Sequence, residues 1–162
     1  RILRTRPSAA FVGAAYDIDS LHATVGVVLH DSSGKFLSAG NNVAGDCVDA
    51  LMAEAIALRF GLNLAQSFGC SRLIINSDNS NVIAAMQDGG TFSGLVAAIF
   101  DDCYHMARDL SQIHYEHCHR EGNFIVHELA RIARFFPPGT WFDEAPIAIA
   151  SMLVNDATLI TT

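Results

Sequence analysis

The stretch LIINSD at residues 73–78 decides the fold class of this chain. It is a short, continuous apolar run that ends in an acid. Such a run is typical of a strand buried in the middle of a sheet that is covered by helices. We therefore predict a strand at residues 72–77 with Asp78 at its end, and this strand favours an α/β arrangement.

The chain before this strand is predicted to supply one long helix and three strands. A helix is expected from Cys47 to about Ser67, with Asp46 as its N-cap and Gly69 as its stop. The turn at residues 31–34 joins two of the strands in an antiparallel hairpin. The three predicted strands cover residues 11–16, 25–30 and 35–41.

The chain after residue 78 is predicted to be helical before it returns to the sheet. Gly89 and Gly90 end a first helix, Ser93 caps a second, and Pro137 with Pro138 stops a third. The helices are expected at residues 79–87, 93–109 and 123–135, with a strand at 113–119. The predicted fold is a mixed five-stranded sheet, three antiparallel strands first, flanked by helices.

Two acids lie in apolar surroundings. Glu54 is part of the helical run LMAEAIAL at residues 51–58, and Asp78 closes the central strand. An acid in such a place is costly unless it is paired or holds a cation. The strand at residues 11–16 offers Gly13 at the point from which a third carboxylate would reach the same spot. Asp17 is four residues further on, about 13 Å away, and is predicted to belong to a solvated turn.

Five segments together resemble the ribonuclease H fold, and more narrowly the plant reverse-transcriptase-like ribonuclease H domains, many of which descend from retroelements. The resemblance covers residues 9–136, and residues 141–157 also look like that subfamily. The segments are VGAA at 12–15, GVVLHDSSG at 26–34, AEAIALRFGL at 53–62, SD at 77–78, and REGN with HELA at 120–123 and 127–130.

The resemblance implies cleavage of the RNA strand of RNA–DNA hybrids, with two Mg2+ or Mn2+ ions held by four carboxylates. Carried over by register, the four positions are Gly13, Glu54, Asp78 and His127, so two acids remain. Two metals about 4 Å apart need a bridging carboxylate, and Gly13 has no side chain to supply it. We expect metal binding at Glu54 and Asp78 to be weak or absent.

The resemblance also places His117 at the position of a loop histidine that assists the second metal in the family, although His117 is predicted to lie on a strand. His114, His117, Cys118 and His119 could instead form a zinc cluster. Alternation along a strand sends His117 and Cys118 to opposite faces, and no second ligand pair follows. We therefore interpret them as partly exposed strand residues.

The expected function is that of a degenerate ribonuclease H-like domain, non-catalytic or strongly impaired, with Glu54, Asp78 and His127 as a vestigial cluster. Without metal the two carboxylates would repel each other and the pKa of one would rise. Glu54 could hydrogen-bond to Ser77 or His127, and Asp78 could simply cap the following helix. The alternative is an active ribonuclease H with an atypical metal site.

The net charge of the chain limits which partners it can bind. The net charge is -7 and Lys35 is the only lysine, which argues against a strong grip on phosphates. Weak binding of an RNA–DNA hybrid or RNA remains one expectation. The other is a protein partner or homodimer at residues 92–109, anchored by Phe100 and Tyr104, which lie four apart on one helical face.

The 162 residues suit one domain, at residues 9–162, with residues 1–8 as a linker or tail that carries three arginines. No apolar stretch reaches about 18 residues without a charge, so no membrane span is expected. The four cysteines show no framework spacing and are interpreted as reduced, buried thiols of a cytoplasmic or nuclear protein.

Overall fold

A mixed six-stranded sheet forms the centre of the computed structural model, which describes residues 7–90, 92–142, 144–145 and 147. The strand order is β5-β4-β1-β2-β3-β6. The strands are β1 (Ser8–Asp17), β2 (His22–His30), β3 (Phe36–Asp46), β4 (Arg72–Ser77), β5 (Gln112–His117) and β6 (Thr140–Phe142). The predicted α/β class is confirmed, but the prediction of five strands was one short.

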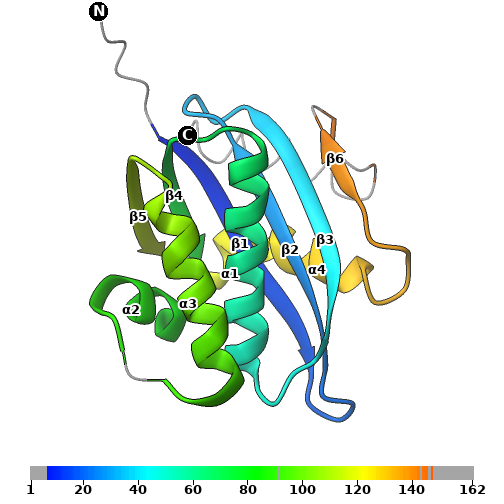
Figure 1. Cartoon of the computed structure of the whole chain (residues 1–162). Coiled ribbons are helices and arrows are strands. Elements are labelled where there is room, and N and C mark those ends of the chain that lie inside the picture. Colours follow the sequence, from blue (N-terminus) through cyan, green and yellow to red (C-terminus); the bar gives the residue numbers. More distant parts are fainter. Residues whose placement is uncertain (1–6, 91, 143, 146, 148–162) are drawn as a thin grey trace, which may run out of the picture.

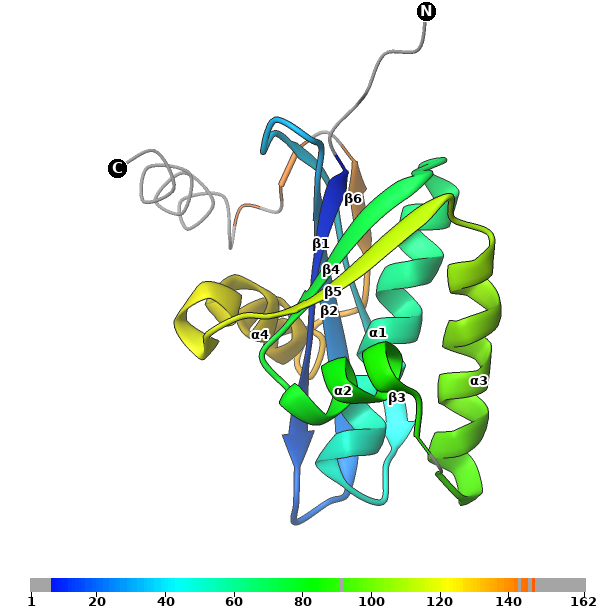
Figure 2. The same ribbon diagram turned by 90° about the vertical axis from the view of Figure 1, so that its left-hand side faces the viewer.

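Helices cover both faces of this sheet, as the apolar strand β4 required. They are α1 (Ala50–Ser67), α2 (Ser80–Asp88), α3 (Gly94–Arg108) and α4 (Phe124–Ile132), with a 3-10 turn η1 (Arg120–Asn123) before α4. Figure 1 shows α1, α2 and α3 on the near face, and the side view in Figure 2 shows α4 on the other. The larger apolar core therefore lies under α1 to α3, and a smaller one, including Val126 and Leu129, lies under α4.

Several element boundaries differ from the predicted ones for identifiable reasons. The N-cap of α1 is Asp49, whose Oδ1 accepts from the Met52 N–H at 2.9 Å, because Asp46 is still part of β3. The cap of α2 is Asn79, whose Oδ1 accepts from the Val82 N–H at 3.0 Å. The side chain of Asp78 is thus not used as a cap.

The sixth strand was missed because only tertiary pairing makes it a strand. β6 is three residues long and pairs antiparallel with Ser38–Gly40 of β3. The Ser38 hydroxyl also donates to the Trp141 carbonyl at 2.8 Å. Three residues carry too little periodicity to predict a strand on their own.

Two glycines let the helices approach the sheet closely. A Cβ on Gly61 of α1 would lie 2.4 Å from Val12 Cγ1, and one on Gly26 of β2 would lie 2.6 Å from the Val126 carbonyl oxygen in α4. Neither contact leaves room for a side chain. The glycines therefore set the depth at which α1 and α4 lie on strands β1 and β2.

β1 and β4 diverge toward their carboxyl ends, beside the candidate site. Their parallel pairing runs from Ser8 with Leu73 to Phe11 with Asn76, but β1 continues to Asp17. Beyond Phe11 the edge of β1 that faced β4 is open. A crevice outside the carboxyl ends of neighbouring parallel strands is the usual place for a ligand in α/β sheets.

The sequence also led to expectations about the cysteines and about membrane-spanning helices. The four cysteines form no disulfide; Cys47 and Cys103 are buried, while Cys70 and Cys118 are partly exposed, so the prediction of four buried thiols was half right. None of the helices in the described part of the chain is long and apolar enough to cross a membrane.

Candidate metal centre

Three of the predicted site residues come together at the carboxyl ends of β1 and β4. Glu54 lies in the second turn of α1, Asp78 follows β4 directly, and His127 lies in the first turn of α4. One oxygen of each carboxyl and one ring nitrogen of His127 lie within 4.8 Å of one another. Within the described residues this is the one group of His, Cys, Asp or Glu side chains with metal-binding geometry.

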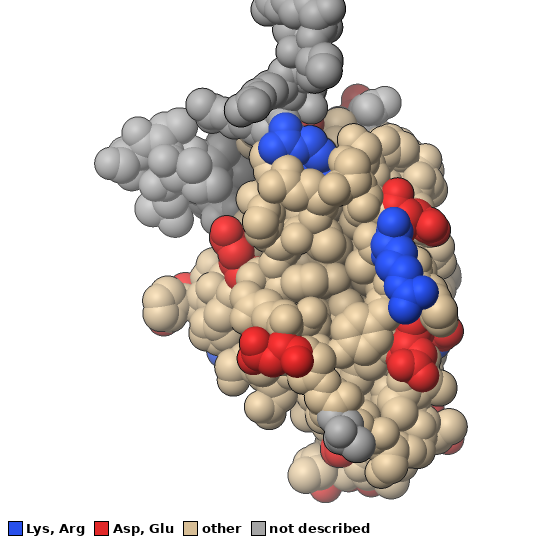
Figure 3. All heavy atoms as spheres, turned by 60° about the vertical axis from the view of Figure 1, so that its left-hand side comes forward, with Lys and Arg blue, Asp and Glu red and all other residues tan. Residues whose placement is uncertain are grey.

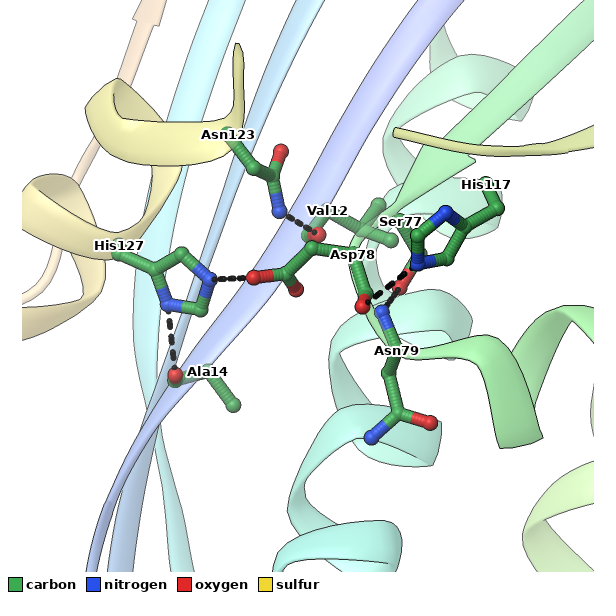
Figure 4. Close-up of polar contacts among 8 residues, drawn as sticks. All are labelled: Val12, Ala14, Ser77, Asp78, Asn79, His117, Asn123 and His127. Carbon is green, nitrogen blue, oxygen red and sulfur yellow. Dashed lines mark hydrogen bonds and ion pairs between the residues drawn. The ribbon is translucent and has the colours of Figure 1, made fainter. Parts of the chain in front are cut away.

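His127 is fixed by two hydrogen bonds, drawn in Figure 4. Its Nδ1 lies 3.0 Å from the Ala14 carbonyl oxygen, and its Nε2 lies 3.0 Å from Asp78 Oδ2. A carbonyl can only accept, so Nδ1 carries a proton and donates it to Ala14. The contact between Nε2 and Asp78 then requires one further proton, held by either the imidazole or the carboxyl.

Glu54 differs from Asp78 and His127 in its hydrogen bonding. The residue is only 9% exposed, and its Oε2 is buried without a hydrogen-bond partner in the described structure. Burial, and secondarily the charge of Asp78, raise the pKa of Glu54 to about 8. The backbone N–H of Ala14 and the charge of Arg120 lower it. The expected increase in one carboxyl pKa is present, while the expected bonds from Glu54 to Ser77 or His127 are not.

The place of the missing first-strand acid, at Gly13, is closed by residues of α4 and η1. The Asn123 Nδ2 donates to the Val12 carbonyl at 2.8 Å and His127 to that of Ala14, so the two side chains straddle Gly13. A Cβ on Gly13 would lie 3.2 Å from Asn123 Nδ2 and Val126 Cγ1 and 3.3 Å from His127 Cε1. Such contacts are tight, so a side chain at Gly13 would require its neighbours to shift.

Asn123 is a site residue that sequence reasoning missed. Its side chain is fully buried and ties η1 to β1, while its Oδ1 has no partner in the described structure. In the sequence, an Asn directly before an apolar helix predicts an N-cap. Here the side chain makes no cap bond, because it turns inward to the open edge of β1. The Val12 carbonyl is available to Asn123 only because β1 diverges from β4 beyond Phe11.

Asp17 does not replace the missing acid. Its Oδ1 accepts from the Asp19 N–H at 2.9 Å, and its Oδ2 pairs with Arg134 at 3.0 Å. The backbone hydrogen bonds of the turn, followed by the charge of Arg134, hold the pKa of Asp17 below its ordinary value. This is the solvated turn that the sequence predicted.

His117 lies beside the centre rather than in it. It ends β5, and its exposed side chain donates from Nε2 to the Asp78 backbone oxygen at 3.1 Å. His114, Cys118 and His119 do not join it in a metal-binding group among the described residues. The role of His117 visible in Figure 4 is to hold the backbone of a site residue.

Of the aromatic pair predicted to anchor an interface, Phe100 is buried in the core and Tyr104 is partly exposed. Phe100 is 1% exposed and its ring lies 4.8 Å from that of Phe92. The hydroxyl of Tyr104 donates to the Ala85 carbonyl at 2.6 Å. The exposed apolar side chain of α3 is instead Leu95. A partner surface at residues 92–109 thus stays a prediction, with Phe100 buried and Tyr104 only partly accessible to a partner.

The residues present do not fit two Mg2+ ions. Mg2+ requires oxygen ligands in near-octahedral order, and one of the four expected positions is a glycine while another is an imidazole. With Gly13 closed over by Asn123 and His127, no carboxylate bridges two ions.

The sequence matches the reverse transcriptase-like family over residues 11–133. No curated protein matches the chain. Similar solved structures include RNase H1 proteins. The structure of RNase H1 from the archaeon Halobacterium salinarum has a TM-score of 0.74 and 20% identity, covering 79% of this chain and 97% of that one.

Two further structures contain an RNA/DNA hybrid. LC11-RNase H1 in complex with the hybrid has a TM-score of 0.71 and 20% identity, covering 77% of this chain and 94% of that chain. The foamy viral protease-reverse transcriptase in complex with the hybrid has a TM-score of 0.66 and 13% identity, covering 83% of this chain and 21% of that chain. At these identities the likeness shows the fold.

Proposed function

We propose that this chain, which belongs to the reverse transcriptase-like family, is a ribonuclease H-like domain that binds RNA–DNA hybrid weakly and has lost two-metal cleavage of it, or retains very little. One observation carries the proposal. The position of the bridging acid is Gly13, and Asn123, Val126 and His127 have closed over it.

The physical reason is charge balance in the transition state. Two-metal cleavage places two dications about 4 Å apart on either side of the reacting phosphate. Their mutual repulsion is strong in a partly buried site and must be offset by carboxylates between and around them. Glu54 and Asp78 can supply at most two negative charges, and the His127 imidazole supplies none. The site therefore cannot hold the pair of ions that the reaction requires.

A hydrolysis assay tests the loss of cleavage. The tag-free domain should give no detectable cleavage of an RNA–DNA hybrid in Mg2+. The double variant Gly13→Asp with His127→Asp should restore some activity, because it returns both acids and removes the His127 ring from the space beside residue 13. Gly13→Asp alone should restore less, because His127 would still place an imidazole where the resemblance expects the fourth acid, and the new side chain would also have to displace that ring. Mg2+-dependent cleavage by the unmodified chain that disappears in Glu54→Ala would overturn the proposal.

The case for weak hybrid binding comes from fold and charge. Two of the similar structures were solved with an RNA/DNA hybrid bound. In this chain several cations are already engaged with acids: Arg59 pairs with Asp102 at 2.8 Å, and Arg134 pairs with Asp17. On the side shown in Figure 3, the described basic side chains are scattered and form no continuous track. Few phosphate contacts are therefore available.

Arg120 is the cation best placed to contact a phosphate at the centre. It lies exposed in η1, and its charge reaches Glu54. Each phosphate contact contributes about one unit to the slope of log affinity against log salt. Arg120→Gln should weaken hybrid binding and make this slope shallower by about one.

The matched control is Arg108→Gln. Arg108 ends α3 near the start of β5, and a six-residue strand spans about 20 Å, so this arginine lies far from the carboxyl end of the sheet. Its replacement should leave hybrid binding unchanged. Equal losses in both variants would indicate non-specific attraction. No binding at low salt would remove the nucleic-acid role and leave the protein-interaction role.

A second function, cleavage with an atypical metal site, is favoured by the three ligand atoms within 4.8 Å of one another. A single ion could still activate water or stabilise a leaving group. The test repeats the hydrolysis assay with Mn2+ in place of Mg2+, with Glu54→Ala as the control for contaminating nuclease. Slow, Glu54-dependent cleavage in Mn2+ would support this second function over the first.

A further inference from the structure

The structure assigns a different metal chemistry to this centre: we propose that Glu54, Asp78 and His127 bind one divalent transition-metal ion, with Zn2+ strongly preferred over Mg2+. The ligands are one oxygen from each carboxyl and Nε2 of His127. The proposal does not rest on hybrid binding or cleavage, and it is tested without nucleic acid.

The first argument is the orientation of His127. Its Nδ1 proton is committed to the Ala14 carbonyl, which leaves Nε2 as the nitrogen that faces Asp78. A backbone carbonyl that holds one ring nitrogen in this way is common behind histidines that ligate metals, because it fixes both the tautomer and the ring plane. The ring plane and the Nδ1 hydrogen bond are thus already those that a metal bound at Nε2 needs.

The second argument is the spacing. The three ligand atoms lie within 4.8 Å of one another, and Nε2 lies 3.0 Å from Asp78 Oδ2. A metal about 2.1 Å from each ligand separates adjacent ligand atoms by about 3.0–3.5 Å. No pair therefore needs to close by more than about 1.8 Å, which side-chain rotation can supply. The ion would take the place of the proton now held between His127 and Asp78.

The third argument is the unmatched charge of Glu54. His127 can compensate one carboxylate, and its Nε2 contact goes to Asp78. Glu54 keeps a buried Oε2 that has no partner within the described structure. An unpaired acid in such a position is costly. One dication would compensate both carboxylates in their ionised form and give this oxygen a partner, whereas the His127 Nε2 contact reaches only Asp78.

The identity of the ion follows from the ligands. Imidazole suits Zn2+ and its neighbours in the first transition row, while Mg2+ takes oxygen ligands and gives up its water reluctantly. Three protein ligands with a further position open to water is the usual arrangement of zinc sites that are not purely structural. The replacement of an acid by His127 therefore changes which metal is preferred, in addition to lowering the number of metals.

The experiment measures Zn2+ affinity of the tag-free, EDTA-treated domain by competition with a chromophoric chelator, followed by titration calorimetry for stoichiometry. One equivalent of Zn2+ should bind, and a large excess of Mg2+ should not displace it. Glu54→Gln and His127→Ala should each weaken Zn2+ binding at least about 100-fold, because removing a ligand costs more than removing its hydrogen-bond partner. His127→Asp should reduce the preference for Zn2+ over Mg2+.

The matched control is the double variant Cys118→Ser with His119→Ala, which removes the other zinc-prone side chains near β5 and should leave the affinity within about twofold. Circular dichroism checks that each variant is folded; if His127→Ala unfolds, the isosteric Glu54→Gln decides the question. Three results would overturn the proposal: no stoichiometric Zn2+ binding, unchanged affinity in Glu54→Gln, or displacement by Mg2+ at comparable concentration. None of them bears on the loss of hybrid cleavage.

Discussion

Two acids near the end of β1 have opposite surroundings. Asp17 ends the strand at the surface, where backbone N–H groups and Arg134 satisfy its carboxylate and hold its pKa low. Glu54 reaches the same end of the sheet from α1, is almost fully buried, and has an oxygen without a partner, so its pKa is raised to about 8. One carboxylate is stabilised by its neighbours and the other is not.

The difference separates a structural turn from an incomplete site. The turn at Asp17 reverses the direction of the chain, and its hydrogen bonds are complete without any ligand. The centre formed by Glu54, Asp78 and His127 is incomplete: it holds two acids, one histidine and a buried oxygen with no partner in the described structure. Native proteins retain such groups where a ligand or ion completes them.

The largest effect is expected from pH, in the presence of EDTA. The folded-state pKa of Glu54 is about 8, against an ordinary value of 4.5. The stability that protonated Glu54 contributes is therefore fully present below about pH 4.5 and is lost as the pH rises toward 8. A shift of this size corresponds to a loss on the order of 3–5 kcal/mol between pH 5 and 9.

Urea unfolding at a series of pH values measures this loss, and Glu54→Gln is the comparison. The amide has the same shape and no charge, so the variant should be more stable than the unmodified chain at pH 9 and should lose much less stability with rising pH. Parallel curves for the two proteins would show that Glu54 is not strained by its burial.

An intermediate effect is expected from His127→Ala. The change leaves the Asp78 carboxylate and the Ala14 carbonyl without their partner, which should lower the free energy of unfolding by about 1–3 kcal/mol. The exposed His119→Ala should change it little. Equal stability of both variants by urea unfolding would mean that His127 does not hold the centre together.

The smallest effect is expected from Asp17→Asn. Because the pKa of Asp17 is lowered in the folded state, its charge contributes stability that is present above its ordinary pKa of 3.8 and lost at lower pH. The carboxyl is exposed, so the contribution is small. Thermal unfolding between pH 7 and pH 3 should show a slightly flatter pH dependence in the variant. A larger change than that of Glu54→Gln would reverse the contrast between the two regions.

The candidate site was partly predictable. Glu54, Asp78 and His127 were identified from the order of motifs, and the isolated acids stood out because their neighbours in the sequence are apolar. The identities of their partners were not predictable. Asn123 and Ala14 matter because of a side chain turned inward and a carbonyl exposed at an open strand edge, and neither has a local sequence signal.

The predicted interface at residues 92–109 also shows what sequence periodicity cannot decide. Phe100 and Tyr104 share a helical face, and their spacing predicts a common environment without saying whether that environment is a partner or the core. Phe100 packs against Phe92 in the core, while Tyr104 is partly exposed and its hydroxyl donates to the Ala85 carbonyl. Periodicity identifies a face, and only the packed layers decide what covers it.

The sequence by itself determined the α/β class and the succession of most elements, because these follow from local periodicity. It also fixed which residues occupy the four positions that the family resemblance assigns, which are Gly13, Glu54, Asp78 and His127. The tertiary structure decided the sixth strand, the closure over Gly13 and the hydrogen bonds of His127. It also decided the isolation of Glu54, whose pKa depends on burial and on an acid 24 residues away. Desolvation and hydrogen-bond completion depend on groups that meet only when distant segments pack together.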